Sequence, residues 1–128
     1  MDTTANFLTI IKNGYLAKMK SVTTDVTKMR LEIARLLKEE GFVEDFIVTE
    51  AKPSSKMTVI LRYFDKIPAI TNLKKVSKSS VRIYAPHNKI PQTLSGAGTT
   101  IVSTPSGLMT GKTAFKKHLG GEVICQIW

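Results

Sequence analysis

Three side-chain hydroxyls lie within four residues of one another, on Ser103, Thr104 and Ser106, and Gly107 follows them. A hydroxyl can donate to and accept from phosphates, ribose hydroxyls and base edges, and glycine lets a ligand approach the backbone closely. The same composition is also that of an ordinary turn. The choice between a turn and a nucleic-acid contact therefore depends on the charge of the chain around this loop.

The charge around the loop is strongly positive. The chain has 19 Lys and Arg against 10 Asp and Glu, a net charge of +9. Residues 66–121 contain no acidic side chain, yet they carry eight lysines and one arginine. Apolar residues are interleaved with these cations throughout, which a solvated basic tail would lack. The pattern favours a folded surface for a polyanion, nucleic acid above all, over a basic surface without a partner.

Arg82, Tyr84 and Glu122 are further candidate contacts. Arg82 and Tyr84 alternate with apolar residues over residues 81–85, so a strand whose apolar set faces a core would put both on the opposite face. They would offer a cation and a stacking plane, although Tyr84 could equally cover the margin of the core. Glu122 is unexpected, because RNA repels a carboxylate unless it holds a lysine in place or accepts from a base amino group.

A nucleotide site at Gly111-Lys112-Thr113 is disfavoured by its spacing. These residues follow a strand and open a helix, as a phosphate-binding loop does, but that motif needs a glycine where Ser106 stands. Residues 66–121 also lack a carboxylate that could organise magnesium. Lys112 is therefore predicted to be a solvated or backbone-contacting lysine.

Cys125 is the single cysteine of the chain, so no internal disulfide is possible. Together with His87 and His118 it supplies too few ligands for a structural zinc site. Cys125 falls in the middle of an apolar strand face and is predicted to be a core residue. His118 ends a lysine-rich helix and is predicted to be a surface histidine. No catalytic residue, metal or cofactor is predicted, and the protein is predicted not to be an enzyme.

The first half of the chain is predicted to have the order helix, strand, helix, strand, strand. Apolar residues three and four apart indicate helices over residues 4–18 and 27–40. Asp25 or Thr27 can cap the second helix, and Gly41 ends it as a left-handed glycine. The last two strands of this half are predicted over residues 43–50 and 56–64.

The second half is predicted to consist mainly of strands. Pro68 interrupts regular structure close to the point where the charge composition changes, which indicates a boundary. The predicted segments are strands over residues 81–85, 100–104 and 122–128, a loop over residues 105–107, and a short helix from Thr110 to near Leu119.

These elements predict an α+β fold with two small packed domains, an N-terminal α-β-α-β-β unit over residues 1–64 and a C-terminal, mainly β unit with a short helix over residues 65–128. A chain of 128 residues has room for little more. The N-terminus lacks a signal-like pattern, and no apolar run approaches the roughly 20 residues of a membrane helix. A cytosolic protein, or the mature product of an organelle, is expected.

Short segments along the whole chain match one known family in order. The most specific are Ser103-Thr104 with Gly107 and, at the right distance, the ending Gly120-Gly121-Glu122-Val123-Ile124-Cys125-Gln126-Ile127-Trp128. The others are Ile10-Ile11-Lys12-Asn13, Leu37-Lys38-Glu39-Glu40-Gly41-Phe42-Val43, Val76-Ser77-Lys78, Arg82-Ile83-Tyr84 and Ile90-Pro91. In these segments the chain resembles the protein-eight family of the small ribosomal subunit.

The resemblance implies a structural component of the small ribosomal subunit. Such a protein is a primary binder of the central domain of the small-subunit ribosomal RNA, helps to assemble the platform and touches neighbouring ribosomal proteins. A monomer when free, a location on the ribosome of the cytoplasm or of an organelle, and no membrane contact are expected.

The resemblance also implies which residues contact the RNA. The family loop usually reads S-T-S-x-G, whereas Pro105 stands here in place of the third hydroxyl, so either Ser106 substitutes for it or one contact is missing. The implied main site comprises Ser103, Thr104, Ser106 and Gly107, flanked by Tyr84 and Lys89 and ordered by Glu122, and secondary phosphate contacts are implied for Lys12, Asn13, Lys28 and Arg30.

Overall fold

The structure of the chain is a computed structural model that describes residues 3–50, 52–78, 80–92 and 98–128. These residues form two compact units, Thr3–Ile70 and Thr71–Trp128. Both units combine antiparallel strands with helices, which confirms the predicted α+β class. The domain boundary expected between residues 64 and 65 stays a prediction. Among the described helices, none has the length and apolar character needed to cross a membrane.

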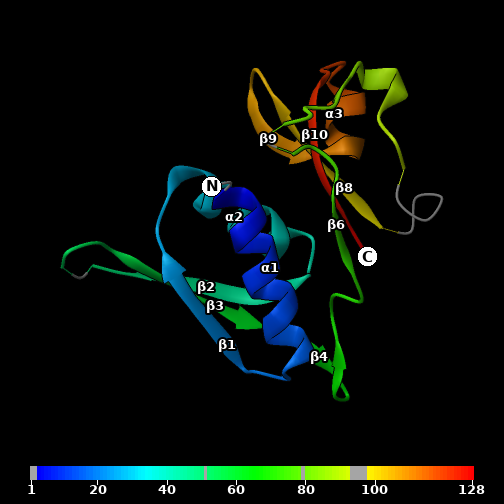
Figure 1. Cartoon of the computed structure of the whole chain (residues 1–128). Coiled ribbons are helices and arrows are strands. Elements are labelled where there is room, and N and C mark those ends of the chain that lie inside the picture. The colour runs from blue at the N-terminus through cyan, green and yellow to red at the C-terminus, as the bar shows by residue number, and fades with distance from the viewer. Residues whose placement is uncertain (1–2, 51, 79, 93–97) are drawn as a thin grey trace. The chain divides into compact units, whose positions relative to one another are not determined.

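The unit Thr3–Ile70 begins with the predicted order of helix, strand, helix, strand and strand (Figure 1). The strand predicted over residues 56–64 is divided into β3 and β4, and β5 follows. Its strands β1, β3 and β2 form an antiparallel sheet in that order, and β4 and β5 form a separate short hairpin. The side chains of its core include Phe7, Ile11, Ile33, Leu37, Met57 and Val59, all fully buried. The elements are α1 (Thr3–Leu16), β1 (Ser21–Asp25), α2 (Lys28–Glu39), β2 (Val43–Thr49), β3 (Lys56–Leu61), β4 (Tyr63–Phe64) and β5 (Ile67–Pro68).

The ends of α2 follow from its sequence. The Thr27 hydroxyl accepts a hydrogen bond from the Arg30 backbone N–H at 3.1 Å, so Thr27 is the cap and Asp25, the other predicted candidate, is not. At the other end Gly41 has a φ of +79°, and the Phe42 N–H donates to the Leu37 carbonyl at 2.8 Å. This left-handed glycine closes the helix as predicted.

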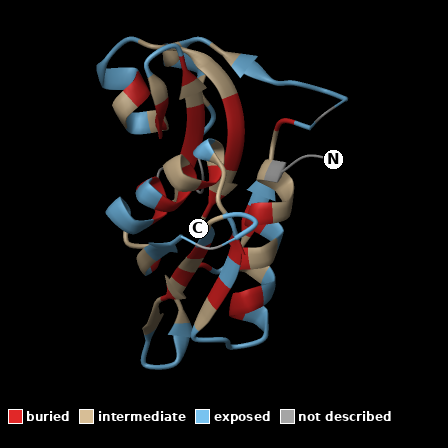
Figure 2. Cartoon of the chain, turned by 90° about the vertical axis from the view of Figure 1, so that its left-hand side faces the viewer, coloured by how far each residue is buried: buried red, intermediate tan, exposed pale blue. Residues whose placement is uncertain are grey.

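The unit Thr71–Trp128 is built around a five-stranded antiparallel sheet in the order β6-β10-β8-β9, with β7 also paired to β10. The core of the unit includes Ile101, Val102, Ala114, Val123, Cys125 and Ile127. Figure 2 shows the buried residues running along the strands. The elements are β6 (Leu73–Lys75), β7 (Tyr84–Ala85), the 3-10 helix η1 (His87–Lys89), β8 (Thr99–Thr104), β9 (Gly107–Thr110), α3 (Gly111–Lys116) and β10 (Gly121–Ile127).

The strand predicted over residues 81–85 is largely wrong. Ladder pairing is confined to Tyr84–Ala85, and Val81 and Ile83 are 56% and 39% exposed instead of facing a core. The reason is that the Ser77 hydroxyl accepts a hydrogen bond from the Ile83 N–H at 2.9 Å and so takes the place of a ladder partner. Alternation along the sequence cannot reveal such a side-chain bond.

The predicted loop over residues 105–107 is a tight turn of a hairpin. Thr104 pairs with Gly107 across it, and the chain continues directly into β9. The strand β9 was not predicted, because its four residues are too few to show a pattern. The three-residue strand β6 was missed for the same reason.

Candidate nucleic-acid interface

Three strands of the unit Thr71–Trp128 bring Tyr84, Glu122 and Ser103 into one row. Glu122 of β10 pairs with Tyr84 of β7 on one side and with Ser103 of β8 on the other. Residues directly opposite each other in an antiparallel pair project from the same face of the sheet. The Tyr84–Glu122–Ser103 row therefore presents a ring, a carboxylate and a hydroxyl side by side. Tyr84 is 69% exposed, so the face of its ring is open to a partner.

The carboxylate of Glu122 has a cationic partner within the same unit. The Arg82 Nη1 lies 3.1 Å from the Glu122 Oε2, and the arginine side chain is about half exposed. The sequence predicted that Glu122 holds a lysine in place or accepts from a base amino group, and its partner within the chain is an arginine. The Arg82 guanidinium is thereby held beside the Tyr84–Glu122–Ser103 row.

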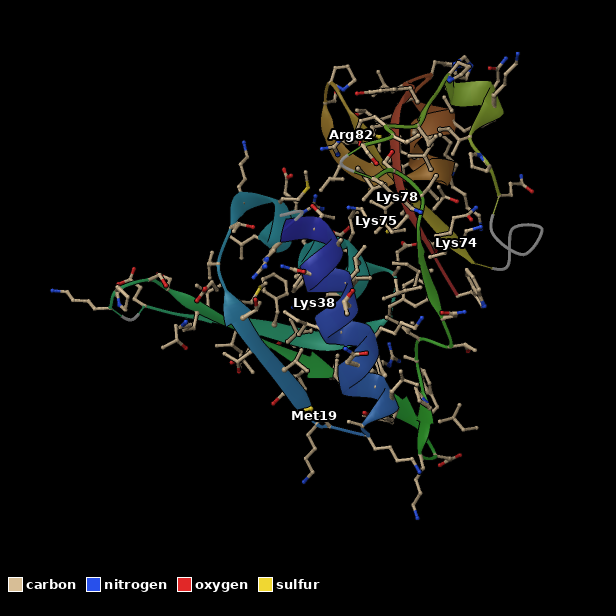
Figure 3. The ribbon with its side chains drawn as sticks, in the orientation of Figure 1. Met19, Lys38, Lys74, Lys75, Lys78 and Arg82 are labelled. Atoms are coloured by element: carbon tan, nitrogen blue, oxygen red, sulfur yellow. The ribbon has the colours of Figure 1, made fainter. Side chains whose placement is uncertain are left out.

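Lysines that sequence analysis did not single out precede this arginine in the chain. Figure 3 labels Lys74, Lys75 and Lys78 together with Arg82, along the segment that begins at β6. Burial lowers the pKa of Lys75, the charge of Arg82 lowers it further, and the charge of Glu122 raises it. The side chain of Lys75 is thus in electrostatic reach of the ion pair. The three lysines within residues 74–78 could have indicated in the sequence that this segment belongs to the basic surface.

The turn between β8 and β9 uses one hydroxyl for its own structure. The Thr104 Oγ1 donates to the Gly107 carbonyl at 2.8 Å and accepts from the Ser106 N–H at 3.2 Å, and Thr104 is buried. Ser106 is exposed at the tip, and Gly107 has a φ of +109°, a conformation that favours glycine. Ser103 and Ser106 are therefore the hydroxyls of this loop that can meet a ligand.

Two glycines allow β10 to enter between its neighbours. A Cβ atom on Gly121 would lie 2.0 Å from the Ser103 carbonyl oxygen, and one on Gly120 would lie 2.6 Å from the Ala85 carbonyl oxygen. Any larger residue would push β7 or β8 away from β10. The Gly-Gly pair is thus the local reason why Glu122 can pair on both sides.

The remaining predicted contacts are distributed over both units. Lys89 lies on η1 of the unit Thr71–Trp128 and is exposed. Lys12 and Asn13 lie on α1, and Lys28 is the first residue of α2, all in the unit Thr3–Ile70. Asn13 and Lys28 are exposed and Lys12 is half-buried.

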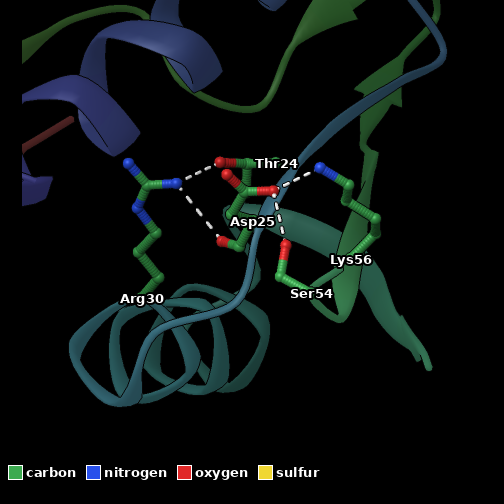
Figure 4. A network of polar contacts seen from close by, with 5 residues as sticks. All are labelled: Thr24, Asp25, Arg30, Ser54 and Lys56. Carbon is green, nitrogen blue, oxygen red and sulfur yellow. Dashed lines mark hydrogen bonds and ion pairs between the residues drawn. The ribbon is translucent and has the colours of Figure 1, made fainter. Parts of the chain in front are cut away.

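Arg30 differs from the other predicted phosphate contacts because it is buried. Figure 4 shows its guanidinium donating to the Thr24 hydroxyl and to the Asp25 carbonyl, the latter at 3.2 Å. Asp25 in turn accepts from Lys56, and this hydrogen bond is the largest cause that lowers the pKa of the carboxyl group. The Arg30 side chain thus joins α2 to the end of β1. Its phosphate contact stays a prediction.

The segment Gly111-Lys112-Thr113 is capped from within the chain. The Thr110 hydroxyl accepts from the Thr113 N–H at 3.2 Å and donates to the Thr113 hydroxyl at 3.0 Å. Thr110 is thus the N-cap of α3. Lys112 is exposed, as predicted for a solvated lysine.

Cys125 and His118 lie where sequence analysis placed them. The Cys125 side chain is fully buried, and burial raises the pKa of its thiol to about 12. His118 is exposed, and its Nδ1 lies 3.3 Å from the Nε2 of His87. Among the described residues, no group of three or more His, Cys, Asp or Glu side chains could hold a metal ion.

The fold and this row define a basic α+β protein whose C-terminal unit carries an aromatic ring, an arginine and hydroxyls close together. Residues 2–128 match the family described as Ribosomal protein S8. The chain belongs to this family, which confirms the resemblance seen in its sequence.

Individual relatives cover the chain almost completely. A small ribosomal subunit protein uS8 of Roseiflexus castenholzii is 44% identical over 128 residues, which cover 99% of this chain and 97% of the relative. The protein of the same name from Mesoplasma florum is 46% identical over 127 residues, which cover 99% and 98% of the two chains. That of Buchnera aphidicola is 45% identical over 127 residues, covering 98% and 96%.

Proposed function

We propose that this chain is a structural component of the small ribosomal subunit and binds ribosomal RNA mainly with the unit Thr71–Trp128. Membership of the ribosomal protein S8 family supports the first part. The observation that carries the site is the Tyr84–Glu122–Ser103 row, in a unit where Glu122 is the single acid among eight lysines and arginines. Phosphates are attracted to such a surface, and the row supplies groups that act at short range.

Each group of the site has a distinct task in RNA binding. The ring of Tyr84 can stack on a base or pack on a ribose, and the hydroxyl of Ser103 can bond to a ribose 2′-hydroxyl. The guanidinium of Arg82 can bind a phosphate with its planar fork of donors, and Glu122 keeps this fork oriented. Ser106 and the backbone of Gly107 extend the contact beyond the end of β8.

The resemblance of the sequence supports a finer assignment of the partner. The RNA is the central domain of the small-subunit ribosomal RNA, and neighbouring ribosomal proteins contact the chain in the assembled platform. The free protein is a monomer, and its place is the ribosome of the cytoplasm or of an organelle. Exposed Asn13 and Lys28, with Lys12, supply secondary phosphate contacts.

A titration of the protein against a central-domain RNA fragment and a scrambled RNA of equal length tests this proposal. We expect Tyr84→Ala to weaken binding to the central-domain fragment by roughly 10-fold to 100-fold, because a stacked base contributes about 1–3 kcal/mol. Ser103→Ala is expected to weaken it about fivefold, the loss of one hydrogen bond of about 1 kcal/mol. Ser106→Ala measures whether Ser106 supplies the hydroxyl that Pro105 lacks.

Ser21→Ala is the matched control, because Ser21 is also a half-buried serine on a strand but belongs to the other unit. It should bind like the unmodified chain. Equal affinity of the unmodified chain for both RNAs would contradict the proposed function. Unchanged binding by both Tyr84→Ala and Ser103→Ala would show that the row is not the site.

A further inference from the structure

A cluster of three rings lies between η1 and α3, beside the Tyr84–Glu122–Ser103 row but not part of it; Phe115 and His118 are exposed and His87 is half-buried. The ring centres of His87 and His118 are 4.9 Å apart, and those of His87 and Phe115 are 6.1 Å apart. Phe115 is 56% exposed although it is the largest apolar side chain of α3. We call His87, Phe115 and His118 the ring cluster. Phe115 is one of several large apolar side chains that the described residues expose, and it is the one that lies against two imidazole rings.

His118 occupies a backbone position that suits glycine better than histidine. It follows the C-cap Lys117 of α3 with a φ of +56°. The His118 N–H donates to the Phe115 carbonyl at 3.1 Å, and the Leu119 N–H donates to the Ala114 carbonyl at 2.9 Å. These two bonds are those of the left-handed helix ending in which glycine is the usual residue. This helix ending holds the His118 ring beside His87, with its Nδ1 3.3 Å from the His87 Nε2.

The ring cluster is continuous with the row along the chain. His87 comes three residues after Tyr84, and His118 comes four residues before Glu122. A Cβ atom on Gly120 would lie 3.2 Å from the His87 backbone nitrogen. The segment that follows β7 and the segment that precedes β10 are therefore in close contact at this point. An RNA bound to the row can therefore reach the ring cluster as well.

The charges around the ring cluster favour an anionic partner. Lys89 of η1 and Lys116 and Lys117 at the end of α3 are all exposed. The carbonyls at the end of a helix would repel phosphate, but in α3 the helix ending engages several of them in hydrogen bonds. The side chains therefore determine the local potential, and Glu122, the single acid of residues 71–128, is paired with Arg82.

We propose that the ring cluster is a second RNA contact, which stacks an unpaired base of the ribosomal RNA while Lys89, Lys116 and Lys117 bind the flanking phosphates. This inference rests on the proposed RNA-binding function. Aromatic and imidazole rings interleaved with lysines are suited to a base that has left the helix, because a paired base keeps its faces inside the stack. An acidic protein partner would use the lysines but has no need for the exposed rings.

Two variants remove the rings without damaging the fold. His118→Gly places the preferred residue at a φ of +56°, so we expect the protein to be more stable, with Tm higher by about 3 °C. Phe115→Ala removes an exposed side chain from a helix. Phe64→Ala is the matched control, because Phe64 is 52% exposed and lies in the other unit.

The test uses the full chain and a central-domain RNA fragment in which unpaired adenines are replaced, one at a time, by the fluorescent base 2-aminopurine. We expect the unmodified chain and Phe64→Ala to quench the fluorescence at one unpaired position or more, by stacking. His118→Gly and Phe115→Ala should abolish the quenching at the position that stacks on the ring cluster, leave any quenching at a base stacked on Tyr84 unchanged, and bind the fragment about tenfold more weakly.

The outcomes separate this inference from the proposed function. Quenching that is the same in all four proteins, with equal affinities, would overturn the ring cluster as a contact while leaving RNA binding by the row intact. A loss of affinity without any change in quenching would also overturn it, since the rings would then not stack on a base. Failure of the unmodified chain to bind the fragment would instead refute the proposed function.

Discussion

Cys125 lies in the middle of β10, where its side chain is fully buried beside the apolar core of the unit Thr71–Trp128. Burial disfavours the thiolate and raises the pKa of the thiol to about 12. Because the thiolate is the nucleophilic form, the thiol is inert at neutral pH. The single cysteine of the chain thus serves packing, as its position in an apolar strand predicted.

We expect the raised pKa of Cys125 to make the folded state less stable as pH rises from about 9 to about 12. In this range the unfolded thiol, with its usual pKa of 9.0, loses a proton that the folded state keeps. The folded state then binds more protons, so the free energy of unfolding falls by up to about 1.4 kcal/mol per pH unit. Urea unfolding at pH 8 and pH 11 measures this fall in the free energy of unfolding.

Cys125→Ala is the comparison for this measurement. The variant should be less stable than the unmodified chain at pH 8, because a cavity replaces the sulfur, but it should lose less stability on going to pH 11. Equal losses in the two proteins would show that the folded thiol ionises as readily as the unfolded one.

At the scale of an element, the start of β10 decides whether the row can form. Gly121 passes so close to Ser103 that a Cβ atom would lie 2.0 Å from the carbonyl oxygen. The hairpin of β8 and β9 depends on another glycine, Gly107, which has a φ of +109°. A Cβ atom on Gly107 would meet no atom within 4 Å, so this position needs glycine for its backbone conformation and not for space. One glycine thus serves close approach and the other serves backbone conformation.

These two glycines give a prediction for paired variants. We expect Gly121→Ala to destabilise the protein by about 3 kcal/mol or more, because the backbone of β8 must move, and to abolish preferential binding of the central-domain RNA. Gly107→Ala should cost about 1 kcal/mol, the ordinary cost of a left-handed alanine, and keep that preference. Denaturant unfolding and RNA titration of both variants measure this. A milder effect of Gly121→Ala than of Gly107→Ala would contradict the geometry.

At the scale of the whole molecule, positive charge is concentrated in one of the two units. Thr71–Trp128 has eight lysines and arginines against one acid, whereas Thr3–Ile70 has eleven against eight. In the unit Thr3–Ile70, acidic side chains also form ion pairs with basic ones, such as Lys38 with Asp45 at 2.9 Å. Attraction to a polyanion should therefore come mainly from Thr71–Trp128.

The salt dependence of RNA binding measures this asymmetry. We expect the double variant Lys78→Ala/Lys89→Ala to bind central-domain RNA more weakly at every salt concentration and to reduce the slope of log affinity against log salt by about 2, one for each phosphate contact. Lys18→Ala/Lys52→Ala removes two exposed lysines from the other unit and should change the slope less. Equal changes in the slope would show that both units attract the RNA alike.

The elements that sequence analysis predicted best carry their own local signals. The helix α2 has a capping threonine, an apolar face and a closing glycine, and each of these acts within a few residues. The strands β8 and β10 are long enough to show β-branched or alternating apolar residues. The excess of positive charge over residues 66–121 follows from composition alone, and it correctly indicated the unit that carries the row.

The sequence by itself determined the family, the sign and location of the charge, the main elements and the core position of Cys125, because each depends on residue types and short spacings. Tertiary structure alone decided that Glu122 holds Arg82 and that Arg30 is buried. These outcomes depend on which distant segments of the backbone pair. Strand pairing is non-local, so no spacing along the chain could have placed Tyr84, Glu122 and Ser103 in one row.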